Sequence, residues 1–328
     1  MKNTVDMSVW QGRVDALEGE LGARWHQRIA PLNEHSQGVA LLGFACDAGV
    51  QRNHGRIGAR FAPTQVRRFL ANIPVSVSHG APHRTPHSAL FDAGDVVCEA
   101  DALESAQAAF AAKITQLLAQ GVFPVGLGGG HEIAYASFCG LADHLERDAE
   151  CKPKIGIVNL DAHFDLRLDE RASSGTPFLQ IANECTRRGW DFHYLCLGVS
   201  EFANTAALFA RARELRVNWR LDEQMREQDL PQILAQVDAF IAPLDVLYLT
   251  IDLDVLPAAV APGVSAPSAL GVPLAVVEAV ADRLCASGKL RVADLAEFNP
   301  ELDVDGHTAR VVARLVARLT AHWERNDE

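Results

Sequence analysis

The chain has 328 residues, of which 48% are hydrophobic and 22% charged, and its formal net charge at pH 7 is −12. This composition excludes a mainly disordered chain. The acidic balance argues against binding to nucleic acid or to an anionic membrane surface, because both need a basic surface. No uncharged apolar run is long enough to cross a bilayer, and the first residues lack the apolar core of a signal peptide. The seven cysteines form no CxxC pair, which favours reduced thiols and predicts a cytoplasmic protein.

Short apolar runs alternate with longer amphipathic segments along the chain. We expect strands at 39–45, 89–97, 122–127, 154–160, 192–197, 245–251 and 290–296. We expect helices at 62–71, 101–120, 176–187, 221–237, 273–286 and 307–323. This alternation predicts an α/β fold with three layers, in which helices cover both faces of a mostly parallel central sheet. No repeat or linker interrupts the pattern, which favours a single domain.

Polar clusters follow directly after four of the predicted strands. The clusters are GGGHE at 128–132, DAHFD at 161–165, DLD at 252–254 and EFNP at 297–300. In open α/β sheets, ligands bind outside the carboxyl ends of the strands. We therefore expect the four clusters to converge on one site.

The residue types in these clusters predict a metal centre. In an extended chain alternate residues point the same way, so the spacing in DAHFD and in DLD aims several side chains at one point. Four carboxylates packed together without cations would be very unfavourable, and two divalent ions would neutralise them. Oxygen donors with two histidine nitrogens suit Mn²⁺ better than metals that prefer thiolates. The candidate ligands are His131, Asp161, His163, Asp165, Asp252 and Asp254.

Each motif also has a simpler interpretation. GGGH alone is typical of a tight turn, and DxD alone is typical of a solvated loop. The whole set of motifs is also compatible with a calcium-like or merely hydrogen-bonded cluster of aspartates. The two histidines argue against Ca²⁺. Two metals about 3.5–4 Å apart can share a water and lower its pKa, which predicts hydrolysis at an electrophilic carbon or phosphorus. The chain lacks the GK[ST] ending of a P-loop and the GxSxG motif of a serine hydrolase.

With these motifs the chain resembles the ureohydrolase family, which contains arginase, agmatinase and formimidoylglutamase. The matching stretches are GFACDAGVQRNHGRIGAR at 43–60, GGGHE at 128–132, NLDAHFDLR at 159–167, SSGTPF at 173–178, TIDLDVLPAAVAPGVSAP at 250–267 and AEFNPELDVDGHTA at 296–309. The resemblance covers nearly the whole chain. It implies an arginase-like fold, a single ureohydrolase domain over 1–328 with residues 1–38 as an N-terminal extension packed on it, and a homo-oligomer.

The resemblance also implies roles for the polar residues. It assigns one Mn²⁺ to His131, Asp161, Asp165 and Asp252, and a second to Asp161, His163, Asp252 and Asp254, so that each chain holds two ions. Asp165 would orient the metal-bridging hydroxide and carry its proton toward the leaving amine. Glu297 would pair with the cationic end of the substrate.

Departures from the arginase and agmatinase patterns favour one subfamily. Those patterns have a histidine just before the glycine of the loop SSGTPF, where this chain has Ser174 before Gly175. Arg167, with Arg52 and Arg56, offers bidentate binding of carboxylates. These features resemble formimidoylglutamase, in which the loop of Ser174 and Gly175 would face the substrate. The implied reaction is attack of the bridging hydroxide on N-formimidoyl-L-glutamate, giving L-glutamate and formamide in histidine degradation.

Other interpretations remain open at this point. Arg167 would then be a surface arginine paired with Asp169 or Glu170, and Arg52 and Arg56 would have no substrate role. His54 and His193 have no motif support, and Asn204 is a weak candidate for the pocket. The competing functions are a guanidine hydrolase of the arginase or agmatinase type, which releases urea, and a catalytically silent metal-binding protein.

Overall fold

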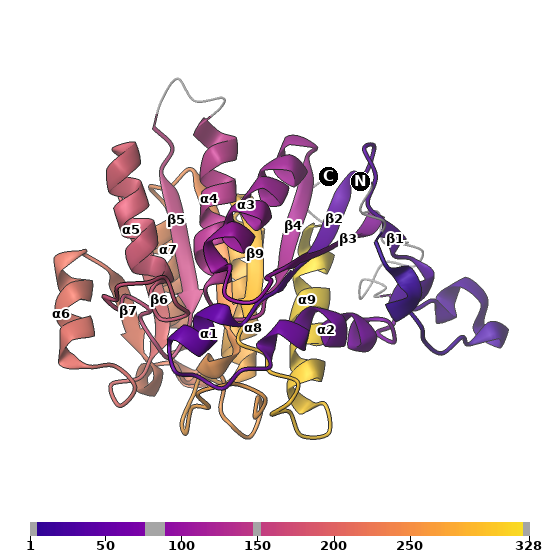
Figure 1. The fold of residues 1–328 in the computed structure, drawn as a ribbon. Helices are drawn as coiled ribbons and strands as arrows, with labels where there is room; N and C mark the ends of the chain where they lie inside the picture. Colours follow the sequence, from indigo (N-terminus) through magenta and orange to yellow (C-terminus); the bar gives the residue numbers. More distant parts are fainter. Residues whose placement is uncertain (1–4, 76–88, 147–151, 324–328) are drawn as a thin grey trace.

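A central sheet lies between two layers of helices in the computed structural model, which describes residues 5–75, 89–146 and 152–323 (Figure 1). The described strands lie in the order β1-β3-β2-β4-β9-β8-β5-β6-β7, and every pairing between neighbours is parallel. The predicted three-layer α/β fold is therefore confirmed.

All seven predicted strands are present, with ends that agree to within two residues. The two strands that the sequence did not predict, β1 and β7, are short and form the two edges of the sheet. The strands are β1 (Ala30–Pro31), β2 (Gly38–Ala45), β3 (Ala89–Val97), β4 (Val122–Leu127), β5 (Ile155–Leu160), β6 (His193–Val199), β7 (Asn218–Leu221), β8 (Val246–Asp252) and β9 (Leu290–Ala296).

Five of the six predicted helices are confirmed, and α1, α4 and α6 were not predicted. The helices are α1 (Ala48–Arg52), α2 (Ala62–Leu70), α3 (Leu103–Ala119), α4 (Ile133–Glu146), α5 (Pro177–Arg188), α6 (Ala206–Glu214), α7 (Leu230–Ile241), α8 (Leu274–Ala286) and α9 (His307–Trp323). Short 3₁₀ turns are η1 (Met7–Val9), η2 (Ala16–Gly22), η3 (Trp25–Gln27), η4 (Ala59–Phe61), η5 (Asp222–Gln224), η6 (Glu227–Asp229) and η7 (Leu253–Val255).

The prediction of a helix at 221–237 was wrong over its first part. Helix α7 begins only at Leu230, and the residues before it form β7 and the turns η5 and η6. Pro231 lies in the first turn of α7. Proline lacks a backbone N–H and is tolerated only in the first turn, so it marks the start of the helix and excludes a longer one.

The side chains of each central strand alternate between two hydrophobic clusters. In β2, Val39 and Leu41 belong to the cluster that contains residues of α2, α7, α8 and α9, whereas Ala40, Leu42 and Phe44 belong to the cluster that contains residues of α3, α4 and α5. This alternation follows from the period of two residues in a strand. The central strands are therefore buried on both faces.

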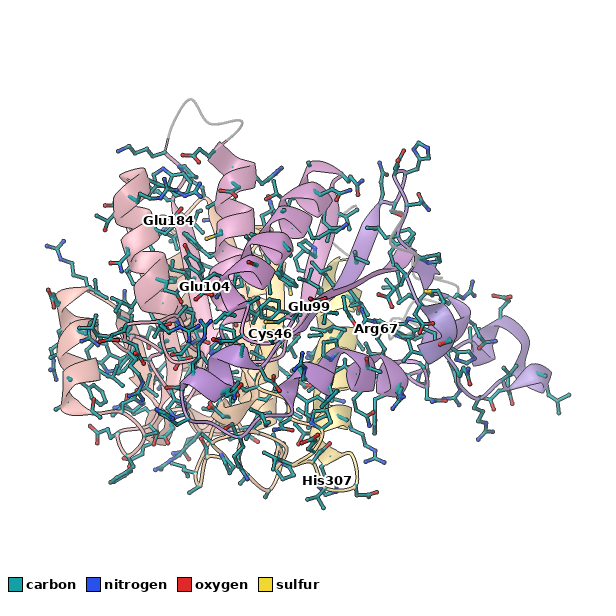
Figure 2. All side chains as sticks on the ribbon, in the orientation of Figure 1. Cys46, Arg67, Glu99, Glu104, Glu184 and His307 are labelled. Atoms are coloured by element: carbon teal, nitrogen blue, oxygen red, sulfur yellow. The ribbon has the colours of Figure 1, made fainter. Side chains whose placement is uncertain are left out.

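The N-terminal segment packs along one edge of the sheet. Trp10 and Trp25 belong to the hydrophobic core, and β1 pairs with β3. The indole N–H of Trp10 donates to Asp92 at 2.7 Å, and Arg67 of α2 (labelled in Figure 2) donates to the same carboxylate at 2.8 Å. Residues 1–4 lie outside the described residues. The domain boundaries, with 1–38 as an extension, stay a prediction.

The described residues contain no helix with both the length and the apolarity needed to cross a membrane. Of the seven cysteines, Cys151 lies outside the described residues, whereas Cys46, Cys98, Cys185 and Cys196 are buried thiols.

The order of the strands decides where the polar clusters meet. Strands β4, β9, β8 and β5 are consecutive in the sheet. Their carboxyl ends lie along the lower edge of the sheet in Figure 1, where the loops after β8 and β9 also lie. The four predicted clusters are thus brought to neighbouring positions on one edge.

We expect the substitution Leu249→Ala to lower the free energy of unfolding by about 2–5 kcal/mol, because it leaves a cavity in the core. Leu249 is fully buried in β8, whereas Leu17 in η2 is fully exposed. Leu17→Ala is the matched control, with an expected change within about 0.5 kcal/mol. Urea denaturation followed by circular dichroism measures both, and equal losses would contradict this assignment of the core.

Candidate metal centre

The structure brings all six predicted ligands together in two groups that share Asp161. Within each group the potential ligand atoms lie within 4.8 Å of one another. The first group consists of His131, Asp161, Asp165 and Asp252, and the second consists of Asp161, His163 and Asp254.

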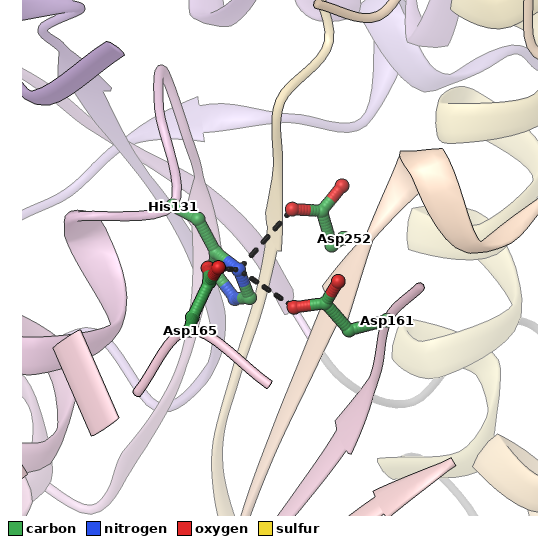
Figure 3. A group of neighbouring side chains, drawn as sticks. All are labelled: His131, Asp161, Asp165 and Asp252. Carbon is green, nitrogen blue, oxygen red and sulfur yellow. Dashed lines mark hydrogen bonds and ion pairs between the residues drawn. The ribbon is translucent and has the colours of Figure 1, made fainter. Parts of the chain in front are cut away.

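His131 Nδ1 is the atom around which the first group is arranged. It lies 2.9 Å from Asp165, 3.1 Å from Asp161 and 3.2 Å from Asp252. Figure 3 shows the carboxylates pointing toward the imidazole ring. His131 follows β4, Asp161 and Asp165 follow β5, and Asp252 ends β8. Three strands thus contribute to one small space.

The second group is built around His163. Its Nδ1 lies 2.9 Å from Asp254 and 3.5 Å from Asp161. The backbone N–H of Asp254 donates to Asp252 Oδ1 at 2.8 Å. Asp252 belongs to the first group only, so its expected bridging role stays a prediction.

The carboxylates destabilise one another's charged forms. Burial and the charge of Asp161 raise the pKa of Asp165 to about 6. Burial and the charge of Asp254 raise the pKa of Asp252 well above its usual value. Burial also acts on Asp161, but hydrogen bonds from His131 and His163 outweigh it and lower the pKa of Asp161.

The histidines compensate part of this charge. Burial opposes protonation of His131, but hydrogen bonds to three aspartates outweigh it and raise the pKa of His131. Protons bound to His131 and Asp165 can therefore offset part of the negative charge of the cluster. Divalent cations would serve the same purpose with more charge, and the mixed oxygen and nitrogen donors suit Mn²⁺. The residues present thus fit a metal centre.

Three residues at the site have a strained backbone. Asp165, Glu297 and His54 have φ angles of 47°, 67° and 60°, in the left-handed region that residues other than glycine rarely adopt. The N–H of Glu297 donates to the carbonyl of Gly129 at 2.8 Å. Such strain persists only where the surroundings enforce it, and it is common at functional sites.

The glycines before His131 allow close packing of the loops. A Cβ atom at Gly129 would lie 1.7 Å from the carbonyl oxygen of Cys46, so only glycine fits there. The N–H of His131 donates to Glu297 Oε1 at 2.8 Å. The loops after β2, β4 and β9 are thereby held together.

A cavity of about 440 Å³ opens over the cluster. One part of its wall is formed by Glu297 and by three candidate metal ligands, Asp165, Asp252 and Asp254. A second part is formed by residues of the segments 50–56 and 167–175. The lining residues are Val50, Asn53, His54, Gly55, Arg56, His163, Asp165, Arg167, Ser174, Gly175, Ala203, Leu208, Asp252, Asp254, Ser265, Ala266 and Glu297.

Of the three predicted arginines, the structure brings Arg56 and Arg167 to the cavity but not Arg52. The Arg52 guanidinium instead donates to Asp101 at 2.6 Å and to Glu104 (labelled in Figure 2) at 2.7 Å. Arg56 lines the cavity, yet its guanidinium donates to the carbonyls of Val264 and Ser265. The guanidinium groups of Arg52 and Arg56 are thus already occupied by contacts within the protein. Arg167 is therefore the better candidate to bind an anionic group of a ligand.

Two of the cavity-lining residues that sequence reasoning missed are Asn53 and His54. Asn53 lines the cavity and donates to Ser174 Oγ at 3.2 Å, and His54, taken as an ordinary histidine, also lines it. Both lie in the stretch 43–60 that resembled the ureohydrolases, which was the available signal. Asn204 is not in the wall but accepts from the Phe164 N–H and donates to the Ala162 carbonyl, so it braces the loop after β5.

Comparison with known proteins agrees with these features. A model of the arginase family matches residues 37–321. The chain is 59% identical over 325 residues to a formimidoylglutamase of Ralstonia nicotianae, covering 97% of this chain and 96% of the relative. It is 55% identical over 322 residues to a formimidoylglutamase of Aeromonas hydrophila, covering 97% and 98%.

Solved structures show the same fold. The structure of formimidoylglutamase from Bacillus subtilis has a TM-score of 0.80 at 22% identity, covering 92% of each chain. The structure of Trypanosoma cruzi formiminoglutamase with Mn²⁺ has a TM-score of 0.77 at 22% identity, covering 92% of this chain and 98% of that one. At this level of identity the likeness establishes the fold.

We expect Mn²⁺ to raise the melting temperature more at pH 8 than at pH 6. Burial raises the pKa of Asp165 to about 6 and that of Glu297 to about 8 in the folded protein without metal. These groups keep protons that the unfolded chain has released, so the metal-free protein loses stability as pH rises from about 5 to 8. Bound cations would remove this loss.

Thermal unfolding with Mn²⁺ or with EDTA at both pH values measures the effect. Free metal at 100 times the dissociation constant adds about 2.7 kcal/mol per site, enough to shift the melting temperature by several degrees. A shift that is equal at both pH values, or larger at pH 6, would contradict the expectation.

Proposed function

This chain belongs to the arginase family, and we propose that it is a formimidoylglutamase. It would hydrolyse N-formimidoyl-L-glutamate to L-glutamate and formamide in histidine degradation. The relatives that carry this name are 55% and 59% identical over nearly the full chain. The observation that carries the proposal is a cavity with buried carboxylates on one wall and, on another, the Arg167 guanidinium, which has no partner among the described residues.

The cofactor in this proposal is a pair of Mn²⁺ ions per chain. His131, Asp161, Asp165 and Asp252 would hold one ion, and Asp161, His163, Asp252 and Asp254 the other. When bound, two such ions lower the pKa of a shared water and so supply hydroxide at neutral pH. The donor set and the electrostatic repulsion within the cluster support this assignment.

Glu297 would recognise the amidinium head of the substrate. It lines the cavity, and burial together with the charge of Glu132 raises its pKa to about 8. A carboxylate that is costly to ionise alone is stabilised by a cationic partner. Glu297 is already oriented by the N–H of His131 at 2.8 Å, so it would meet the amidinium with little rearrangement.

Arg167 would bind a carboxylate of the glutamate tail. It lines the cavity, and within the described residues its guanidinium has no hydrogen bond or ion pair. Among the described residues Arg167 forms no ion pair with Asp169 or Glu170, so that alternative has no support. A free, planar guanidinium suits bidentate binding of a carboxylate.

Ser174 and Gly175 would shape the wall beside Arg167. A Cβ atom at Gly175 would approach Arg167 Nε to 3.2 Å and Asn53 Nδ2 to 3.1 Å, so glycine keeps this space open. Ser174 Oγ accepts from Asn53 and can still donate to the substrate. Arg56 would line the wall without binding the substrate carboxylates as its main partner, because its guanidinium already donates to backbone carbonyls.

Asp165 is the proposed proton carrier. It faces the cavity from the strained turn after β5 and belongs to the first group of candidate ligands. A carboxylate beside the reacting atoms can act first as a general base and then as a general acid. It would accept the proton of the attacking water and deliver it to the leaving amine.

We also infer that the protein acts in the cytoplasm and forms a homo-oligomer, as expected from the cysteine content and the family resemblance. Size-exclusion chromatography with light scattering measures the assembly directly.

We expect only N-formimidoyl-L-glutamate to be turned over when the Mn²⁺-loaded protein is incubated in parallel with this compound, L-arginine and agmatine. Glutamate and formamide would be the products, measured by chromatography. Urea from either guanidine would instead favour the alternative function, an arginase or agmatinase type. No turnover of any substrate would favour a silent metal-binding protein.

We expect Arg167→Ala to reduce kcat/KM by about 10- to 100-fold, mainly through KM, because a hydrogen bond to a charged group contributes about 1.5–3 kcal/mol. Arg171→Ala is the matched control, since Arg171 lies nearby but pairs with Asp101 outside the cavity. Equal effects of the two substitutions would contradict a substrate role for Arg167.

A further inference from the structure

Asp294 is a buried carboxylate that the proposed reaction does not use. It lies within β9, and none of its surface is exposed. Its Oδ2 accepts from Ser137 Oγ at 2.5 Å and from the Tyr248 hydroxyl at 2.7 Å. Its Oδ1 is also buried and has no hydrogen-bond partner among the described residues. A carboxylate in the core of a sheet is unfavourable unless neighbouring groups compensate it.

The neighbouring strands make room for Asp294 and direct hydroxyl groups at it. Its cross-strand partners are Gly126 on β4 and Thr250 on β8. A Cβ atom at Gly126 would lie 2.7 Å from Asp294 Cβ, so glycine leaves the space that the carboxylate needs. Burial raises the pKa of Asp294, and the hydroxyls of Ser137, Thr250 and Tyr248 oppose that rise. Because Thr250 and Asp294 are paired directly across β8 and β9, their side chains lie on the same face of the sheet as neighbours.

Thr250 also contacts a residue of the metal centre. Its Oγ1 lies 3.0 Å from His131 Nε2. The other ring nitrogen, Nδ1, faces the aspartates of the first group. A histidine that binds a metal through Nδ1 carries its proton on Nε2, so Nε2–H would donate to Thr250 Oγ1. The hydroxyl proton of Thr250 is then available for Asp294 Oδ1.

We propose that Asp294 is a positioning residue for His131 and acts on it through the Thr250 hydroxyl. The chain from His131 through Thr250 to Asp294 would fix the tautomer and the orientation of the imidazole ring, as carboxylates do for metal-binding histidines in general. This inference rests on the proposed metal site. Because His131 belongs to only one of the two groups, Asp294 acts on the binding of one ion of the two.

Titration with Mn²⁺ tests this proposal without any substrate. Free Mn²⁺ is followed by electron paramagnetic resonance in the wild type and in the Asp294→Asn and Thr250→Val variants. In Asp294→Asn, Ser137 and Tyr248 keep the amide oxygen on their side, so the amide NH₂ faces Thr250 and cannot accept its proton. We expect both variants to bind one Mn²⁺ about 10- to 100-fold more weakly and the other with unchanged affinity.

Two further variants separate positioning from a loss of folding. Thr250→Ser keeps the hydroxyl and is expected to retain wild-type affinity at both sites. Thr115→Val makes the same change at a buried threonine of α3, whose hydroxyl donates to the carbonyls of Ala111 and Gly140. It is expected to leave both affinities unchanged. The double variant Asp294→Asn/Thr250→Val should bind no more weakly than either single variant, because both interrupt one chain.

The outcomes distinguish this inference from the proposed metal site. If the wild type binds two Mn²⁺ ions and Asp294→Asn and Thr250→Val bind both with wild-type affinity, the positioning role is wrong and the metal site stands. Equal weakening of both ions, or additive losses in the double variant, would also overturn the positioning role. If the wild type binds no Mn²⁺, both ideas fail.

Discussion

Mutual repulsion among Asp161, Asp165, Asp252 and Asp254 is the constraint on which the rest of the site depends. These carboxylates are brought together with little access to water, and burial with neighbouring negative charge raises the pKa of three of them. Such a cluster is stable only with compensating positive charge. The histidines supply part of it, and the proposed Mn²⁺ ions would supply the rest.

The fold brings these carboxylates to one place and holds them there. The strands β4, β9, β8 and β5 are neighbours, so their carboxyl ends form one edge. The left-handed backbones at Asp165 and Glu297 cost about 1–3 kcal/mol each, which the packed loops must offset. The Glu297 N–H donates to the Gly129 carbonyl and so holds the turn after β9, and the Phe178 N–H donates to the Asp165 carbonyl and holds the turn after β5. The loops at this edge of the sheet thus hold one another, and with them the residues of the site, in place.

Much of the architecture was predictable because its signals are local. Apolar runs gave the central strands, and short polar motifs at their ends gave the cluster. The edges were harder, because β1 and β7 are too short to show a periodic pattern. The sequence alone does not reveal the order of the strands, since pairing joins segments that are far apart along the chain. That order is what turns four separate motifs into one site.

Individual side-chain roles were less predictable for the same reason. Arg52 has the residue type that a carboxylate-binding site needs, but its pairing with Asp101 and Glu104 depends on contacts about fifty residues away. Asp294 follows Val292 and Ala293 and precedes Leu295 in β9, a local signal that sequence reasoning passed over. Its meaning depends on Thr250 lying across from it on β8.

The most direct test of this account is a crystal structure of the protein grown with Mn²⁺, with anomalous diffraction to locate the metal. We expect two anomalous peaks in each chain, one among His131, Asp161, Asp165 and Asp252 and the other beside Asp161, His163 and Asp254. A single peak would contradict the two-ion site. The absence of any peak among these residues would show that divalent cations do not balance the buried carboxylates.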